Sequence, residues 1–154
     1  MKEKQYETML EQLKGLTAGE TNPTSVLANA SALMRDVMGE RYFWVGFYLV
    51  EGDRLVLGPF QGSVACYRIG HGRGVCGTAW AQARTQVVPD VEQFAGHIAC
   101  SSLSRSEIVV PLIDGTGTVR GVLDIDSKEL AQFDNTDASY LEQAARIIAG
   151  ALWP

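Results

Sequence analysis

The fold of this chain is decided by one stretch, SEIVVPLIDGTGTVRGVLDID, which runs from Ser106 to Asp126. Two apolar runs within it, Ile108–Ile113 and Val119–Asp126, flank a turn that contains glycine. Two such runs on either side of a short glycine-containing turn are typical of a β-hairpin. We therefore expect an antiparallel pair of strands at this point of the fold.

The register of this hairpin depends on its turn. If Gly115 and Thr116 form a two-residue turn, Glu107 lies directly opposite Asp124. Glycine at the first central position favours a type II′ turn, so this is the register that we predict. A β-bulge in either strand would shift it.

Three carboxylates are expected on one face of the hairpin. Side chains of a strand alternate between the two faces, which places Glu107, Asp124 and Asp126 together with Val109 and Val122. The opposite face would carry Ile108, Val110, Leu123 and Ile125. Because like charges on neighbouring strands repel, the cluster indicates either a solvated acidic face or a site for a cation, which would be a metal ion or the ammonium group of a ligand. Crowding also raises the pKa of one carboxyl group, which can then donate a proton near neutral pH.

A second apolar strand is predicted at Tyr42–Val50, YFWVGFYLV. Its alternating sets are Phe43, Val45, Phe47 and Leu49 on one face, and Tyr42, Trp44, Gly46, Tyr48 and Val50 on the other. A strand that is apolar on both faces is covered on both sides. Trp44 and Tyr48 then either fill core space or form the aromatic wall of a pocket, with Gly46 leaving room for a ligand.

Helical patterns precede and follow the strands. Apolar residues recur at helical spacing in three segments: Tyr6, Met9, Leu10, Leu13 and Leu16; Val26, Leu27, Ala30, Leu33, Met34, Val37 and Met38; and Tyr140, Leu141, Ala144, Ile147, Ile148 and Ala151. Asp134, with Asp137 three residues on, predicts the capped start of the last helix. The order of helices, strands and a final helix predicts an α+β fold with a mostly antiparallel sheet, in a single domain that spans residues 1–154.

Composition excludes several classes of partner. The chain has 154 residues, of which 13 are Lys or Arg and 18 are Asp or Glu, which gives a net charge of −5. This balance argues against nucleic acid and against an anionic membrane. We find no apolar signal segment behind the first residues and expect a cytoplasmic protein.

All three cysteines, Cys66, Cys76 and Cys100, lie in a glycine-rich and weakly periodic middle segment between Gln61 and Ser106. In the cytoplasm they indicate chemistry, metal binding or packing rather than a structural disulfide framework. The glycines around Cys76 and the polar residues after Cys100 favour accessible thiols. A nearby cation, His97 or Arg105, would stabilise the thiolate of Cys100.

Other uses of this segment are weaker. Zinc bound by Cys66, Cys76, His97 and Cys100 would need ligands in closely spaced pairs, but Cys66 and Cys76 are ten residues apart, so we expect no metal. A Gly-x-Ser-x-Gly elbow is absent from the sequence. The run Gly70–Gly74 is rich in glycine but lacks the Gly-Lys-Ser/Thr ending of a phosphate-binding loop.

These segments together resemble the free methionine-(R)-sulfoxide reductases, which are built on a single GAF domain. The matching pieces are WVGFY (44–48), LGPFQG (57–62), ACYRI (65–69), GVCG (74–77), DV (90–91), GHIAC (96–100), SEIVVP (106–111) and GVLDIDS (121–127). Two positions depart from the family's usual pattern, since Ala95 stands in place of proline and Ser101 in place of aspartate. The resemblance implies a GAF-like fold whose N-terminal and C-terminal helices pack on one face of the sheet.

The resemblance also implies a role for each candidate residue. Cys100 would be the nucleophile, Cys66 the resolving thiol and Cys76 an alternative resolving thiol. The family's substrate contacts map onto Trp44, Tyr48, Glu107, Asp124 and Asp126, and onto backbone amides near Ile98, Ala99 and Cys100. The substrate would be free methionine-(R)-sulfoxide, with no bound cofactor and with thioredoxin as the external reductant.

Two other functions and one assembly remain open at this point. A GAF-type sensor would bind a small ligand or report redox state without turnover. A metal-dependent hydrolase would use the acidic face, but no histidine is placed to share that cluster. By analogy with GAF domains, the first, second and last helices would pair two copies of the chain into a homodimer.

Overall fold

A computed structural model of the chain describes residues 1–98 and 100–154. Its elements are α1 (Lys2–Thr17), α2 (Pro23–Met38), η1 (Gly39–Arg41), β1 (Trp44–Glu51), β2 (Arg54–Gln61), β3 (Arg68–Gly70), α3 (Gly74–Gln82), β4 (Gln86–Val88), η2 (Val91–Gln93), β5 (Ser106–Ile113), β6 (Val119–Ser127) and α4 (Asn135–Leu152). The strands form one sheet in the order β3-β2-β1-β6-β5-β4, and each neighbouring pair is antiparallel. Strands β1 and β6 therefore lie next to each other at its centre.

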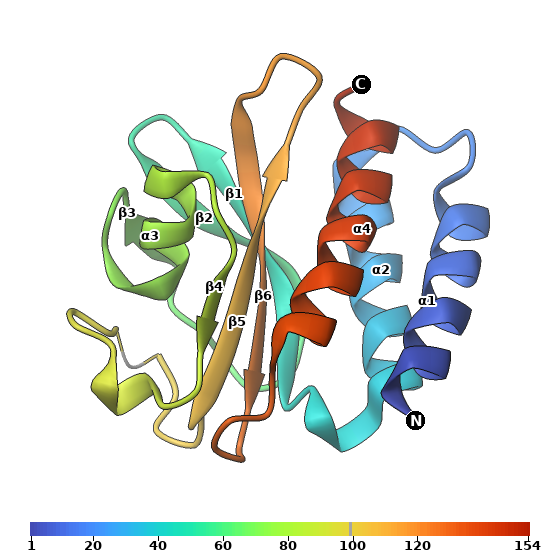
Figure 1. Cartoon of the computed structure of the whole chain (residues 1–154). Helices are drawn as coiled ribbons and strands as arrows, with labels where there is room; N and C mark the ends of the chain where they lie inside the picture. Colours follow the sequence, from blue (N-terminus) through green and yellow to red (C-terminus); the bar gives the residue numbers. More distant parts are fainter. Residues whose placement is uncertain (99) are drawn as a thin grey trace.

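Helices α1, α2 and α4 cover one face of the sheet (Figure 1). The apolar stripe of each helix meets the side chains of β1, β5 and β6 in the larger of two cores, which includes Tyr6, Leu27, Phe47, Ile108, Leu123 and Leu141. At the start of α4, the Asp134 side chain accepts from backbone amides while Asp137 accepts from the Asp134 amide, so the predicted cap is confirmed. The predicted α+β fold, with terminal helices on one face of an antiparallel sheet, is also confirmed.

The opposite face of the sheet is covered by α3 and the loops around it (Figure 1). A smaller core on this side joins Trp44 and Tyr48 of β1 to Val109, Val122 and Cys76. Strand β1 is therefore covered on both sides, as its two apolar faces predicted. The predicted faces are wrong only for the two residues before the strand. Tyr42 packs in the larger core and Phe43 against the smaller one, which is the reverse of the prediction.

The hairpin of β5 and β6 has the predicted faces but a different register. Glu107 pairs with Asp126, and Asp124 pairs with Val109. The predicted two-residue turn is wrong because Gly117, not Gly115, takes the left-handed conformation, with φ of 86°. The Asp114 side chain accepts from the backbone amides of residues 116 and 118 and lengthens the loop. A further irregularity between Leu112 and Ile113 completes a shift of two residues, which leaves every side chain on its expected face.

The middle segment is more regular than its sequence pattern indicates. It contains β3, α3 and β4, of which the two strands have three residues each and the helix has nine. Elements this short do not complete enough turns or alternations to give a readable period. Weak periodicity therefore did not mean irregular structure for these residues, and this matters because α3 carries Cys76.

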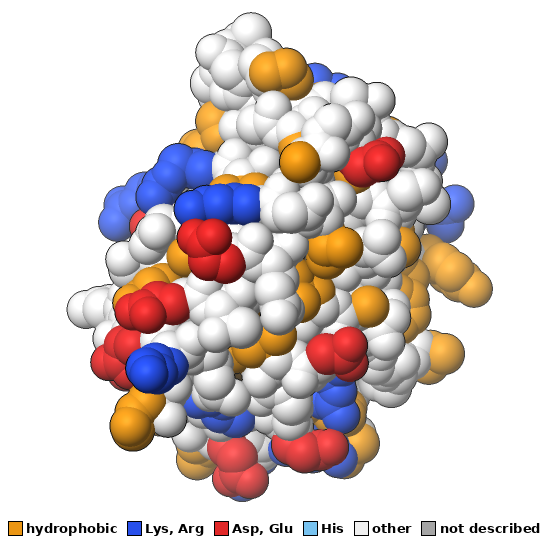
Figure 2. Space-filling model, turned by 90° about the vertical axis from the view of Figure 1, so that its right-hand side faces the viewer, with side chains coloured by type: hydrophobic (Ala, Val, Ile, Leu, Met, Phe, Trp, Pro, Cys, Tyr) orange, Lys and Arg blue, Asp and Glu red, His pale blue; other side chains and the backbone are white. Residues whose placement is uncertain are grey.

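Figure 2 views the helical side of the molecule, where acidic and basic side chains are scattered and apolar ones show between them. Among the helices that the structure describes, none combines the length and the apolar character needed to cross a membrane. A homodimer through α1, α2 and α4 stays a prediction.

Candidate active site

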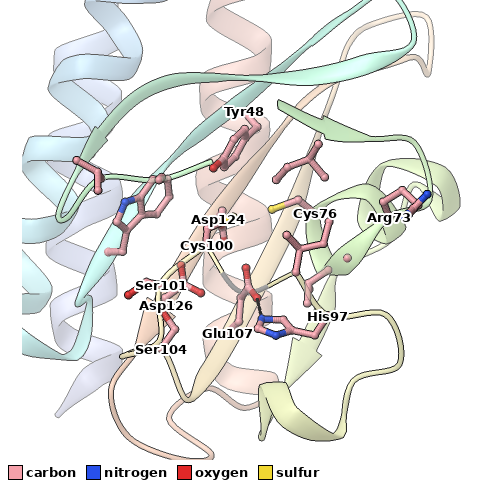
Figure 3. Close-up of a pocket in the computed structure, with 17 residues that line it drawn as sticks. Tyr48, Arg73, Cys76, His97, Cys100, Ser101, Ser104, Glu107, Asp124 and Asp126 are labelled. Atoms are coloured by element: carbon pink, nitrogen blue, oxygen red, sulfur yellow. Dashed lines mark ion pairs between the residues drawn. The ribbon is translucent and has the colours of Figure 1, made fainter. Parts of the chain in front are cut away.

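A small pocket opens on the α3 side of the sheet, and most of the predicted site residues line it (Figure 3). Its walls come from β1, β5 and β6, from the first turn of α3, and from the loops before β3 and before β5. The lining includes Trp44, Tyr48, Cys76, Glu107, Asp124 and Asp126. Its volume is about 50 Å³, which is small beside the roughly 300–1,000 Å³ of most ligand clefts.

Two of the three cysteines form a disulfide at the mouth of this pocket. Cys66 is bonded to Cys100, and their Cα atoms lie 5.4 Å apart although 34 residues separate them in sequence. Both residues are half-buried, and Cys100 lines the pocket. The bond removes two members of the zinc set weighed from the sequence, and it joins the loop before β3 to the loop before β5.

The third cysteine, Cys76, is a free thiol with only 4% of its surface exposed. The expectation of an accessible thiol is wrong here, because the neighbouring glycines allow close packing. A Cβ atom on Gly77 would collide with the backbone of Gly70 and Gly72, and one on Gly74 would press on Ile98. Burial raises the pKa of the Cys76 thiol, and Asp124 and Glu107 add to this effect.

The three predicted carboxylates do lie together on the pocket side of β5 and β6. Glu107 and Asp124 are each 6% exposed, and Asp126 is half-buried. Burial, with Asp124 next, holds the pKa of Glu107 well above its usual range, and the same two causes raise the pKa of Asp126. Burial also raises the pKa of Asp124, but hydrogen bonds with Glu107 and Cys76 oppose that rise. The cluster thus offers two carboxyl groups that favour the neutral form and one that is better able to keep its charge.

One oxygen of this cluster has no hydrogen-bond partner among the residues that the structure describes. Asp124 Oδ1 is buried and accepts no hydrogen bond from the residues that the structure describes. Cys76, Glu107 and Asp124 each bring one donor atom into a group whose members lie within 4.8 Å of one another. A buried acceptor without a partner is costly, so this arrangement is suited to a ligand that brings a positive charge or a hydrogen-bond donor.

The structure does not support the prediction that His97 or Arg105 supplies a cation beside the thiolate of Cys100. The expectation that no histidine shares the acidic cluster is wrong, because His97 Nε2 lies 4.0 Å from Glu107 Oε1 (Figure 3). Burial lowers the pKa of His97, while Asp124 acts in the opposite direction. Arg105 is exposed and does not line the pocket. The arginine in the lining is Arg73, which precedes the first residue of α3.

Two aromatic residues form one wall of the pocket and also hold the Cys66 loop. The rings of Trp44 and Tyr48 are stacked, with centroids 6.1 Å apart. Trp44 Nε1 donates to the carbonyl of Ser63 at 2.9 Å, and the Tyr48 hydroxyl donates to the carbonyl of Cys66, also at 2.9 Å. The aromatic wall therefore anchors the loop that carries one half of the disulfide.

The predicted role of Gly46 is not confirmed. A Cβ atom at this position would meet the side chain of Phe60 and come within 2.9 Å of the indole ring of Trp44. The space above Gly46 is thus filled by Phe60 and Trp44, whose rings stack at 5.1 Å, and not by a ligand.

Of the two remaining predicted contact residues, Ile98 and Ala99, the structure describes one. The side chain of Ile98 lines the pocket, whereas Ala99 lies outside the described residues. Arg73 and Ser104 also line the pocket, and sequence reasoning did not identify them. For Arg73 a signal was present, because Gly70–Gly74 leads directly into the helix start that faces the pocket. For Ser104 the sequence carries no comparable signal.

Comparison with known proteins gives consistent similarities. Residues 20–152 match the model of the GAF domain family. The chain is 49% identical over 138 residues to the free methionine-R-sulfoxide reductase of Escherichia coli, covering 90% of this chain and 82% of that protein. It is 44% identical over 153 residues to the enzyme of the same name from Saccharomyces cerevisiae, covering 96% of this chain and 85% of that protein.

A solved structure agrees with these matches. It is the X-ray structure of free methionine-R-sulfoxide reductase from Neisseria meningitidis in complex with its substrate. The TM-score is 0.91 at 54% identity, with 95% of this chain and 87% of that chain covered. The fold described above is thus that of an enzyme crystallised with its substrate bound.

Proposed function

From the premise that this chain belongs to the GAF domain family, and within it to the free methionine-R-sulfoxide reductases, we propose that it reduces free methionine-(R)-sulfoxide to methionine. The single observation that carries the proposal is the Cys66–Cys100 disulfide at the mouth of a pocket lined by carboxyl groups. A disulfide in this position is the product expected when two thiols have reduced a sulfoxide.

In the first step, the thiolate of Cys100 attacks the sulfur of the sulfoxide. A proton from the pocket goes to the sulfoxide oxygen, which is transferred to Cys100 as a sulfenic acid, and methionine leaves. Glu107 and Asp126 are the candidate proton donors, because burial and the neighbouring Asp124 raise their pKa values and so favour the neutral acid. This step oxidises the thiol by two electrons and reduces the sulfoxide by the same number.

In the second step, the thiol of Cys66 attacks the sulfenic acid of Cys100, releases water and forms the disulfide. Cys66 is favoured over Cys76 as the resolving thiol because it is the residue bonded to Cys100, while Cys76 is buried and its thiolate is disfavoured. An external dithiol such as thioredoxin then reduces the disulfide, and no bound cofactor takes part. A cytoplasmic location would suit this reduction, because thiols are kept reduced there.

Selection of the free amino acid follows from the carboxylate cluster. The ammonium group of the substrate would bind at Asp124, whose Oδ1 is buried and lacks a partner in the described residues. Trp44 and Tyr48 would contact the methyl group and the side chain. A peptide-bound methionine sulfoxide has no ammonium group, so it would leave the buried carboxylate uncompensated. Backbone amides near Ile98, Ala99 and Cys100 are proposed to bind the polar end of the substrate.

The pocket of the disulfide form is too small for its substrate. A volume of about 50 Å³ holds a few water molecules at most. Because the disulfide ties the Cys100 loop to the Cys66 loop across the mouth, its reduction would release the loops and let the pocket enlarge. The disulfide form is therefore the state that follows product release.

The alternative, a GAF-type sensor without turnover, is not favoured. Relatives that carry the name of the reductase align over most of this chain, and a substrate-bound structure has the same fold at 54% identity. A sensor without turnover would need no buried group of proton donors.

The proposal is tested by NADPH consumption in the presence of thioredoxin and its reductase. We expect turnover with the free R epimer, and none with the free S epimer or with either epimer in a peptide. Dithiothreitol should replace thioredoxin in a parallel assay that follows methionine release. Absence of methionine release from the free R epimer with both reductants would exclude the proposed activity.

A further inference from the structure

The loops that carry the disulfide expose an unusual share of apolar surface. Eight large apolar side chains are exposed among the described residues, and four of them flank the two bonded cysteines. Val64 and Tyr67, on either side of Cys66, are 87% and 74% exposed, while Ile98 and Leu103, near Cys100, are 37% and 55% exposed. The other four, Met1, Leu16, Ile113 and Leu130, lie elsewhere in the sequence. Apolar groups gathered at one place on a surface mark a contact site.

Each of these four apolar residues lies within three positions of a bonded cysteine in the sequence. The bond holds the two loops together, with 5.4 Å between the Cα atoms of Cys66 and Cys100, and both cysteines are half-buried. Reduction requires a thiolate of the partner to reach one of the two sulfur atoms and to form a mixed disulfide. The partner must therefore rest on the side chains that surround the bond.

Charge gives a second indication about the partner. The whole chain has a net charge of −5, yet residues 62–73 contain two arginines and no acidic residue. Arg68 and Arg73 are exposed, and neither forms an ion pair with any residue that the structure describes. Figure 3 shows the Arg73 side chain directed away from the carboxylates of the pocket. Two unpaired cations beside the disulfide favour a partner that presents acidic groups next to its reactive thiol.

We propose that Val64, Tyr67, Ile98 and Leu103, with Arg68 and Arg73 at their edge, form the docking surface for a dithiol reductase. The partner would be a small protein whose reactive cysteine is surrounded by apolar residues and flanked by acidic ones. This inference rests on the proposed function, since it names the surface through which that cycle is completed. We call these six residues the reductant-docking surface.

The test measures the disulfide step alone, so that it does not depend on sulfoxide turnover. The oxidised protein is mixed with reduced thioredoxin in the absence of sulfoxide, and disulfide reduction is followed by the appearance of free thiols. We expect the second-order rate constant to fall about tenfold in the double variant Tyr67→Ser/Leu103→Ser, because exposed aromatic and apolar anchors dominate such contacts. Reduction by dithiothreitol should stay within about twofold of the unsubstituted protein.

Two variants complete the design. Leu16→Ser removes an exposed leucine from α1, on the opposite side of the sheet, and should leave both rates unchanged. Arg68→Glu should slow reduction by thioredoxin and weaken its dependence on salt, whereas Lys14→Glu on α1 should not.

Three outcomes would overturn the docking surface. The first is an unchanged rate with thioredoxin in Tyr67→Ser/Leu103→Ser. The second is an equal loss with thioredoxin and dithiothreitol, which would place these residues in the disulfide chemistry itself. The third is a change of oligomeric state with normal thioredoxin kinetics, which would assign the surface to a second copy of the chain. Failure of the proposed function, by contrast, would appear as absent methionine release with a normal rate of disulfide reduction.

Discussion

The hydroxyl group of Tyr48 donates a hydrogen bond of 2.9 Å to the backbone carbonyl of Cys66. Tyr48 lies in the central strand β1 and lines the pocket, whereas Cys66 lies in the loop before β3. The bond connects the wall that would contact the substrate to the thiol that would resolve the intermediate. It gives Tyr48 a second role, which is to position Cys66.

We predict that Tyr48→Phe slows disulfide formation more than methionine release. The phenylalanine ring keeps the pocket wall, but the loop loses one hydrogen bond, which is worth about 1 kcal/mol, or roughly fivefold in rate. A single-turnover experiment measures both steps, with methionine quantified against the loss of free thiols over time. Tyr67→Phe is the matched control, because its hydroxyl makes no hydrogen bond within the described residues. Equal slowing of the two steps in Tyr48→Phe would contradict a positioning role.

The three cysteines should give three different results when substituted. Cys100→Ser should abolish methionine release, since Cys66 does not line the pocket and the thiol of Cys76 is buried. Cys66→Ser should release about one methionine per enzyme and then recycle poorly. Cys76→Ala should keep multiple turnover and still form the Cys66–Cys100 disulfide, because the Cys76 thiol is buried and free.

Peptide mapping by mass spectrometry under non-reducing conditions checks the disulfide in each variant. A disulfide between Cys76 and Cys100 in the turnover product of the unsubstituted enzyme would reverse the assignment of the resolving thiol.

Asp124 Oδ1, which has no partner in the described residues, predicts the site of the ammonium group. Asp124→Asn should raise the KM for free methionine-(R)-sulfoxide by about tenfold or more, because a charge-assisted hydrogen bond to a buried carboxylate is worth roughly 1.5–3 kcal/mol. Asp36→Asn, an exposed position on α2, is the control and should change nothing. The KM is measured with dithiothreitol so that the reductant step stays constant. An unchanged KM in Asp124→Asn would place the ammonium elsewhere.

Proton donation predicts a pH dependence of the first step. Methionine release should fall as pH rises through the raised pKa values of Glu107 and Asp126, because only the neutral acids can donate. The donor is the residue whose amide variant, Glu107→Gln or Asp126→Asn, lowers the rate about a hundredfold and removes this alkaline decline. If both variants keep the decline, the proton comes from neither residue.

The same buried carboxyl groups should make stability depend on pH. The folded-state pKa of Glu107 lies well above its ordinary value of 4.5, so above that pH the unfolded chain releases a proton that the folded protein still holds. The free energy of unfolding therefore falls as pH rises from about 4.5 toward the folded-state pKa. Glu107→Gln removes one titrating group, so its stability should fall less steeply over this range.

Thermal unfolding of the disulfide form over a series of pH values measures this slope. Glu51→Gln, at an exposed position at the end of β1, should keep the slope of the unsubstituted protein. A slope unchanged in Glu107→Gln would mean that Glu107 is charged in the folded protein.

The hairpin shows how far periodicity determines a site. Alternation along β5 and β6 was sufficient to place Glu107, Asp124 and Asp126 on one face, because the observed shift in register is an even number of residues. The partner of each residue was not predictable, since it depends on hydrogen bonds from the turn to the Asp114 side chain and on a bulge. Periodicity therefore predicted on which face of the sheet each carboxylate lies, but not which residue of the neighbouring strand it pairs with.

The sequence by itself determined the α+β class, the helix faces, the central strands and the three carboxylates on one face of the hairpin. These properties depend on the apolar periods and on residue chemistry, which are local. Only the tertiary structure decided which thiols meet, because 34 residues separate Cys66 from Cys100 and their approach depends on how two loops cross the pocket. It also decided that Cys76 is buried and that Asp124 Oδ1 lacks a hydrogen-bond partner within the described part of the chain, since burial is set by elements distant in sequence.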